Sequence, residues 1–126
     1  MKKLRESDIE KYLVKRVKEA GGEIRKVKWI GRRGAPDRII FWPYRNTINC
    51  IVFVEVKAPG EKATEAQERE MKIIRKSDIP AFCVNSIKGV DQIISGYYKQ
   101  TDAKKFSKKF RTYYNRFYFS VPEDRK

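Results

Sequence analysis

The chain has 126 residues, a formal net charge of +14 at pH 7 and no histidine, which excludes histidine-based acid–base catalysis, histidine zinc sites and Ser-His-Asp triads. That length supports a single domain, and a positive charge of that size favours a polyanionic partner. No apolar run approaches the roughly 18 residues that span a bilayer, and Met1-Lys2-Lys3 does not begin a signal peptide, so we expect a soluble, cytoplasmic protein without membrane contact.

The first predicted element is a helix that begins at Ser7-Asp8-Ile9-Glu10, an S-x-x-E capping box, and ends at Gly21-Gly22. Its apolar stripe consists of Ile9, Leu13, Val14, Val17 and Ala20. Glu10 has two interpretations: it caps the first turn, or it points inward at the end of the stripe and serves a functional site. Glu6, one turn earlier on the same face, is the alternative in the second case.

An edge strand is predicted next, over Glu23–Trp29, with Lys26 and Lys28 on a basic face. The loop Gly31-Arg32-Arg33-Gly34 follows. Glycine lets a backbone approach a ligand closely, and the guanidinium fork matches phosphate oxygens. The candidate nucleic-acid contacts are therefore Arg32, Arg33, Lys26 and Arg38, unless the loop is simply solvated.

Two apolar strands are predicted over 37–42 and 50–56, and the turn at 43–47 pairs them as a hairpin. Pro36 marks where the first strand begins, because proline cannot donate a backbone hydrogen bond. The second strand is β-branched and aromatic on both alternating faces, which is typical of a strand covered on both sides.

Three charged residues interrupt this apolar pattern. Glu55 and Lys57 are two residues apart in a strand, so their side chains share a face. If Asp37, at the start of the other strand, lies near Glu55, the two carboxylates can hold a hard divalent cation such as Mg²⁺. Lys57 would then supply positive charge for a phosphate or for the water that attacks it.

A second helix is predicted from the T-x-x-Q capping box at Thr64–Gln67 to about Lys76. Gln67 either caps this helix or faces inward with Met71 and Ile74. A buried strand over 81–84 and a short amphipathic helix over 90–94 follow. For Cys50 and Cys83, which lie within strand patterns, core packing is favoured over a metal or redox role.

From Tyr97 onward, aromatic residues alternate with lysine and arginine, which divides the chain into a core, 1–96, and a basic, aromatic C-terminal extension, 97–126. The aromatic rings either stack on unpaired bases or pack on the core or a second subunit. Helical spacing favours packing for Phe106, Phe110, Tyr113 and Phe117.

Pro36-Asp37 followed by Glu55-Val56-Lys57 resembles the PD-(D/E)xK nuclease signature. The wider segments GRRGAPDRIIF and VFVEVKAPG, with Gln67 on the next helix, are similar to the VRR-NUC family of that superfamily, over about residues 6–94. E-x-K alone is a weak motif, since Glu70-Met71-Lys72 also fits it in a predicted helix. The combination carries the resemblance, and a glycine usual in the turn at 77–80 is missing.

The resemblance implies an α/β, restriction-endonuclease-like core with a mixed central sheet flanked by helices in the order αβββαβ. It also implies a metal-dependent DNA endonuclease, with Mg²⁺ or Mn²⁺ on Asp37, Glu55, the Val56 carbonyl and Glu10. Lys57 and Gln67 would complete the catalytic set. By the same resemblance, stand-alone members of the family look like homodimers that cut branched DNA such as Holliday junctions. The alternatives are a non-catalytic nucleic-acid-binding module and a flap, end-acting or restriction-like nuclease.

Overall fold

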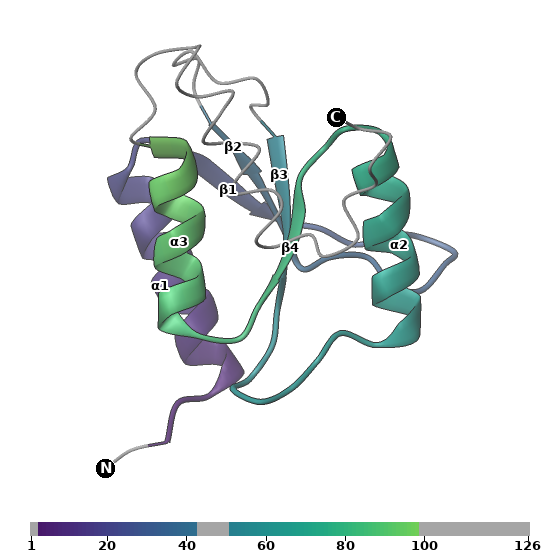
Figure 1. Ribbon diagram of the computed structural model, residues 1–126, viewed down its shortest axis with the longest axis horizontal. Helices are drawn as coiled ribbons and strands as arrows, with labels where there is room; N and C mark the ends of the chain where they lie inside the picture. The colour runs from purple at the N-terminus through teal and green to yellow at the C-terminus, as the bar shows by residue number, and fades with distance from the viewer. Residues whose placement is uncertain (1–2, 43–50, 99–126) are drawn as a thin grey trace.

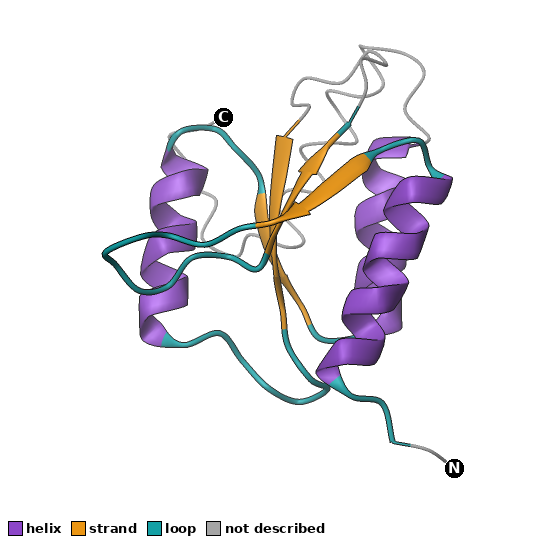
Figure 2. Cartoon of the chain, turned by 180° about the vertical axis from the view of Figure 1, so that it is seen from behind, coloured by secondary structure: helices purple, strands orange, loops and turns teal. Residues whose placement is uncertain are grey.

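A computed structural model describes residues 3–42 and 51–98, which form a mixed four-stranded sheet between two layers of helix (Figure 1). In chain order the elements are α1 (Glu6–Glu19), β1 (Glu23–Lys26), β2 (Arg38–Phe41), β3 (Ile51–Val56), α2 (Glu65–Lys76), β4 (Ala81–Val84) and α3 (Ile87–Tyr98). Helices α1 and α3 cover one face of the sheet and α2 covers the other (Figure 2). The predicted α/β fold with the order αβββαβ is confirmed, and α3 completes it.

The strands lie in the order β1-β2-β3-β4, antiparallel except for the parallel pair β3 and β4. Ile40 lies opposite Val52 and both are fully buried, because side chains at even-numbered positions of β2 and β3 face α1 and α3. Ile39 lies opposite Phe53 on the other face, toward α2. Continuing the same register by two residues brings Asp37 beside Glu55 on that second face.

Helix α1 does not begin with the predicted capping box. Its N-cap is Arg5, and the backbone N–H of Arg5 donates to the Asp8 carboxylate at 2.9 Å. The pairing of Ser7 with Glu10 was therefore wrong, because Asp8 stands three residues after the cap and satisfies its amide first. This leaves the Glu10 carboxylate available for a partner elsewhere in the fold.

Two other element boundaries differ from the prediction. β1 ends at Lys26 rather than Trp29, because Lys26 already lies opposite Arg38, the first residue of β2. α3 begins at Ile87 rather than Val90, because the Ser86 hydroxyl accepts a hydrogen bond from the Gly89 N–H at 2.9 Å and so caps the start of the helix. The predicted strand over 81–84 is confirmed as β4, and α2 begins and ends where its capping box and length predict.

The turn after α2 lacks glycine, and Asp78 takes its place there with φ of 62°. Aspartate tolerates this left-handed conformation better than most residues, so the turn forms without a glycine. Cys50, the turn at 43–47 and the extension from 99 onward lie outside the described residues. Within 3–42 and 51–98, none of the helices combines the length and apolar character that crossing a membrane needs.

Candidate active site

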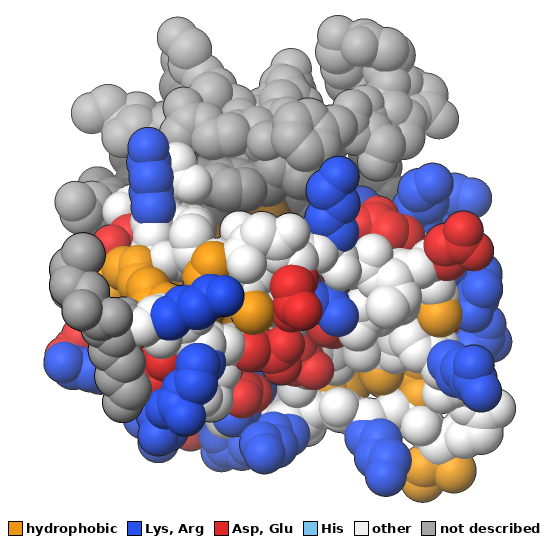
Figure 3. Space-filling view, turned by 90° about the horizontal axis from the view of Figure 1, so that it is seen from below, with side chains coloured by type: hydrophobic (Ala, Val, Ile, Leu, Met, Phe, Trp, Pro, Cys, Tyr) orange, Lys and Arg blue, Asp and Glu red, His pale blue; other side chains and the backbone are white. Residues whose placement is uncertain are grey.

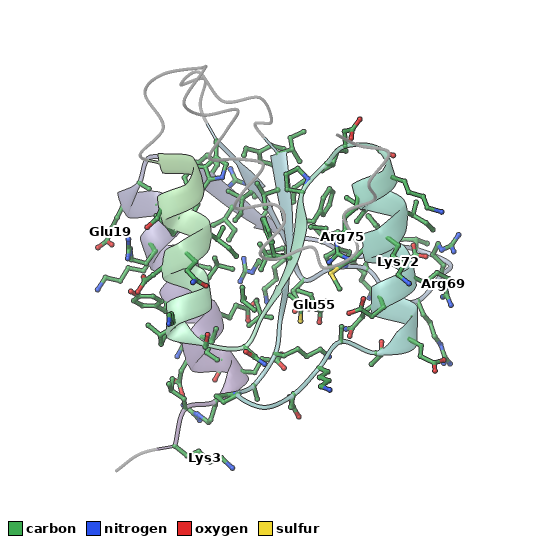
Figure 4. All side chains as sticks on the ribbon, in the orientation of Figure 1. Lys3, Glu19, Glu55, Arg69, Lys72 and Arg75 are labelled. Atoms are coloured by element: carbon green, nitrogen blue, oxygen red, sulfur yellow. The ribbon has the colours of Figure 1, made fainter. Side chains whose placement is uncertain are left out.

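Glu55 is the most deeply buried charged side chain of the described residues, with 2% of its surface exposed. It lies near the end of β3 and points between the sheet and α2 (Figure 4). One carboxylate oxygen, Oε2, accepts a hydrogen bond from the Gln67 amide at 2.7 Å. The other, Oε1, is buried and accepts no hydrogen bond within the described part of the chain. A buried carboxylate with a free oxygen is poised to bind a ligand.

Asp37, the residue directly before β2, is fixed at the same place. Its Oδ2 accepts the backbone N–H of Val56 at 2.8 Å, one residue beyond Glu55, and its own carbonyl accepts the Val27 N–H at 2.9 Å. Both bonds orient the aspartate toward the end of β3. The antiparallel pairing of β2 with β3 thus brings Asp37 close to Glu55, as predicted.

Lys57 and Gln67 complete this group. The Lys57 ammonium lies 3.7 Å from Glu55 Oε2, and its side chain is largely buried. Gln67 does both things that its position allowed: its Oε1 accepts the Thr64 N–H at 2.8 Å and caps α2, while its Nε2 donates to Glu55. Two interpretations that the sequence presented as alternatives are both correct.

The pKa of Glu55 is raised from 4.5 to about 8. Burial is the largest cause, followed by the negative charge of Asp37, and the Lys57 ammonium lowers the pKa. The hydrogen bond that a protonated Glu55 carboxyl donates to Asp37 and the charge of Glu6 raise the pKa further, so Oε1 is free only in the ionised form. Cys83 lies opposite Glu55 on β4, and burial together with Glu55 raises the pKa of its thiol to about 11. The thiol is thus neutral at pH 7, and without a bound cation the Glu55 carboxyl is also mostly protonated at that pH.

This donor set fits a hard divalent cation. Carboxylate oxygens and a backbone carbonyl are the ligands that Mg²⁺ and Mn²⁺ prefer, and Glu55 Oε1 is free to bind. No group of three acidic or thiol side chains is close enough to enclose an ion within residues 3–42 and 51–98. The protein would therefore supply two carboxylates, and the Val56 carbonyl, water and phosphate oxygens would supply the rest.

Glu10 points inward as expected, but toward Arg38. Its Oε2 accepts from the Arg38 Nε at 2.8 Å, and both side chains are largely buried. Arg38 occupies an even-numbered position of β2, on the face toward α1, so this ion pair ties α1 to the sheet. The charge of Glu6, also on α1, makes a small contribution to raising the pKa of Glu55.

Of the other predicted nucleic-acid contacts, Arg33 and Lys26 are exposed. Arg32 instead donates from Nη2 to Glu70 Oε2 at 3.0 Å, and Trp29 Nε1 donates to Glu70 Oε1 at 2.9 Å. Glu70, 5% exposed on α2, thus holds the loop between β1 and β2.

Gly34 brings this loop against α2. It has φ of +97°, and a Cβ there would overlap the Ala66 backbone, so only glycine fits. In the sequence, Glu70 matches only E-x-K within a predicted helix, and that pattern predicts no function for it. Its spacing of three residues from Gln67 places both on the sheet-facing side of α2, and this signal was available.

Charge is distributed unevenly on one face of the molecule. Viewed from the side where the chain leaves β3 for α2, acidic side chains gather near the middle of the face, with lysine and arginine side chains around them (Figure 3). A negative centre can hold a cation, and a positive surround can hold the backbone of a polyanion.

Comparisons with known proteins agree with this geometry. A family model described as the VRR-NUC domain matches residues 3–88. The chain is 49% identical over 70 residues to "Putative nuclease p44" of Acyrthosiphon pisum secondary endosymbiont phage 1, covering 56% of this chain and 71% of that protein. A solved structure described as a VRR_NUC domain matches with a TM-score of 0.65 and 37% identity, covering 74% of this chain and 97% of that chain. The chain therefore belongs to the VRR-NUC family of nucleases.

Proposed function

We propose that this nuclease is a metal-dependent endonuclease that hydrolyses phosphodiester bonds in DNA. The observation that carries the proposal is the Glu55 carboxylate, which is buried beside Asp37 with one oxygen free. Burying the ionised form of Glu55 beside a second acid costs several kcal/mol, since burying even a neutral polar group without a hydrogen bond costs roughly 2–7. A divalent cation would offset the repulsion between the two acids, and the free oxygen of Glu55 would coordinate it.

The residues that would hold Mg²⁺ or Mn²⁺ are Asp37, Glu55 and Val56, the last through its backbone carbonyl. When bound, such an ion polarises the scissile phosphate and lowers the pKa of a coordinated water. Two hydrogen bonds keep the carboxylates in place for this: Val56 N–H to Asp37 and the Gln67 amide to Glu55. Both donors belong to regular elements, so the acids are oriented before any ligand arrives.

Lys57 acts directly on the reacting groups. Its ammonium lies on the same face as Glu55, 3.7 Å from it, where it can hold the attacking water or a phosphate oxygen. As the water oxygen bonds to phosphorus and the bond to the leaving oxygen breaks, negative charge grows on the phosphate oxygens. A fixed, largely buried ammonium stabilises that charge more strongly than a solvated one.

The charge of +14 and the exposed basic residues of the loop before Asp37 support a nucleic-acid substrate, which we propose to be DNA. Phosphate contacts of this kind release counterions, so affinity for DNA should fall steeply with salt. We extend the proposal to branched DNA such as Holliday junctions, cut by a homodimer, because the family resemblance implies it. Two sites related by a two-fold axis would each nick one of two symmetric strands.

The test offers four-way junction, flap, linear duplex and single-stranded DNA, each with Mg²⁺, to wild type and to Asp37→Asn. The matched control is Asp78→Asn, since Asp78 lies in the turn after α2 and asparagine also tolerates its positive φ. We expect wild type and the control to cut alike and Asp37→Asn to lose at least about a hundredfold in rate.

Each other result has a definite meaning. Wild type that binds DNA but does not cut it would support a non-catalytic binding module and remove the endonuclease proposal. Cleavage that survives Asp37→Asn would mean that the site is elsewhere. Preference for flaps, ends or linear duplex would refute the junction, and a monomer in sedimentation would refute the homodimer.

A further pair of variants decides which glutamate of α1 assists the metal. We infer that Glu6 does so, because its charge reaches Glu55, whereas Glu10 is occupied by Arg38. Glu6→Gln should weaken activation by Mg²⁺ and leave stability unchanged. Glu10→Gln should lower stability by roughly 1–3 kcal/mol, because it leaves Arg38 without its charged partner. A loss of Mg²⁺ activation in Glu10→Gln alone would restore Glu10 as the ligand.

A further inference from the structure

In the loop between β1 and β2, the apolar side chain of Ile30 is almost completely exposed to solvent, at 97%. The loop runs alongside α2 and extends past it in both ribbon views (Figures 1 and 2). Its neighbours in sequence Lys28, Arg32 and Arg33 are exposed as well. A single exposed isoleucine is common on protein surfaces, so exposure alone identifies no function. What distinguishes Ile30 is how its backbone is held.

Two side chains that flank Ile30 in the sequence anchor the loop, because both donate hydrogen bonds to the same buried carboxylate. Trp29 donates to one oxygen of Glu70 at 2.9 Å, and Arg32 donates to the other at 3.0 Å. The Trp29 ring also meets Phe53 of β3 edge-on, with centroids 6.3 Å apart. Anchored in this way, the loop tip cannot fold down to bury the isoleucine, although removing such a side chain from water is favourable.

We propose that Ile30 is an apolar wedge that inserts between neighbouring bases of DNA bound at the site, while Lys28 and Arg33 contact the flanking phosphates. This proposal rests on the proposed function. Isoleucine is one of the side chains that can part a base step, and a wedge must be held rigidly to do so. The positive charge around Ile30 favours DNA over an apolar pocket in a protein partner.

The position of the wedge relative to the cut follows from the chain. Ile30 is seven residues from Asp37, and an extended chain spans at most roughly 25 Å over that distance. At roughly 3.4 Å per nucleotide, the parted step lies within about seven nucleotides of the cleaved bond. Parting bases is cheapest where stacking is already interrupted, so the wedge would favour branched or mismatched DNA over a regular duplex.

The test uses 2-aminopurine, a base that fluoresces when it is unstacked, placed singly at successive positions of the duplex and junction substrates. Ca²⁺ replaces Mg²⁺ during the fluorescence measurement so that binding is recorded separately, and cleavage with Mg²⁺ is measured in parallel. The variants are Ile30→Ala, Ile30→Leu and the control Ile73→Ala, since Ile73 is an isoleucine 51% exposed on α2.

We expect wild type, Ile30→Leu and Ile73→Ala to raise the fluorescence at one step within about seven nucleotides of the cut. Ile30→Ala should lose this rise, bind junction DNA about tenfold more weakly and retain less preference for it over duplex. Cleavage by wild type without any rise would overturn the wedge and leave the endonuclease standing. A rise without cleavage would do the reverse, and an Ile30→Ala variant altered only in oligomeric state would overturn the wedge in favour of contact between copies.

Discussion

The raised pKa of Glu55 makes the stability of the metal-free protein fall with pH, and Glu55→Gln should remove that fall. The folded pKa of about 8 lies above the ordinary value of 4.5 that we take for the unfolded chain. Between these two values the folded state keeps a proton that the unfolded state has lost. The stabilising contribution is therefore complete below pH 4.5 and is lost as the pH rises toward 8.

The magnitude follows from proton linkage. One proton difference changes the free energy of unfolding by about 1.4 kcal/mol per pH unit, so wild type should lose about 3 kcal/mol between pH 5 and pH 7 from this group. Asp37 and Glu6 act in the same direction at Glu55, while Lys57 opposes them without cancelling their effect. Glutamine keeps the shape and the hydrogen bond with Gln67 while removing the charge, so Glu55→Gln should gain on wild type as the pH rises.

The assay is urea unfolding in EDTA from pH 5 to pH 8 for both proteins. The difference between their unfolding free energies cancels all other titrating groups, and with a urea dependence of about 1–3 kcal/mol per M, the midpoints should separate by about 1–3 M between pH 5 and pH 7. Glu65→Gln is the matched control, because Glu65 is an exposed glutamate in the first turn of α2. A difference between wild type and Glu55→Gln that stays constant with pH would refute this account of Glu55.

Three further predictions concern the metal and the loop. Saturating Ca²⁺ should raise the melting temperature of wild type more at pH 8 than at pH 6, because the cation competes with a proton, and Asp37→Asn should abolish this gain in thermal scans. Arg32→Ala should lower stability by about 1–3 kcal/mol in urea unfolding, since it leaves Glu70 buried with one bond fewer, whereas Arg33→Ala should change stability by less than about 0.5 kcal/mol; equal effects would refute the anchor. Gly34→Ala should cost at least about 1–3 kcal/mol in the same assay, because its φ is +97° and a Cβ would overlap the α2 backbone, and a neutral result would mean that the loop is not docked there.

Local patterns were sufficient for most of the fold. The T-x-x-Q box located the start of α2, and unbroken β-branched runs located β3 and β4, because capping and strand alternation depend on residues a few positions apart. The same alternation placed Glu55 and Lys57 on one face. At the start of α1 the capping box predicted from Ser7 was wrong, because the structure pairs Asp8 with the N-cap residue Arg5 instead.

The partners of the charged residues were beyond sequence reasoning. Glu10 was expected to point inward and does, but its partner Arg38 lies 28 residues away. Gln67 was given two exclusive roles, and only the packing of α2 against β3 shows that one side chain performs both. Glu70 matches E-x-K only by chance, yet its carboxylate accepts hydrogen bonds from Trp29 and Arg32, which lie 41 and 38 residues away in the sequence.

The amino-acid sequence by itself determined that Glu55 and Lys57 share one face at the end of a strand, because an acid and an amine two residues apart interrupt its apolar pattern. Only the tertiary structure decided that Glu55 has one oxygen satisfied and one free, that its proton is held to about pH 8, and that Ile30 is held out in solvent. The physical reason is that desolvation and charge–charge repulsion depend on distances in space, which register and helix packing set and no local pattern encodes.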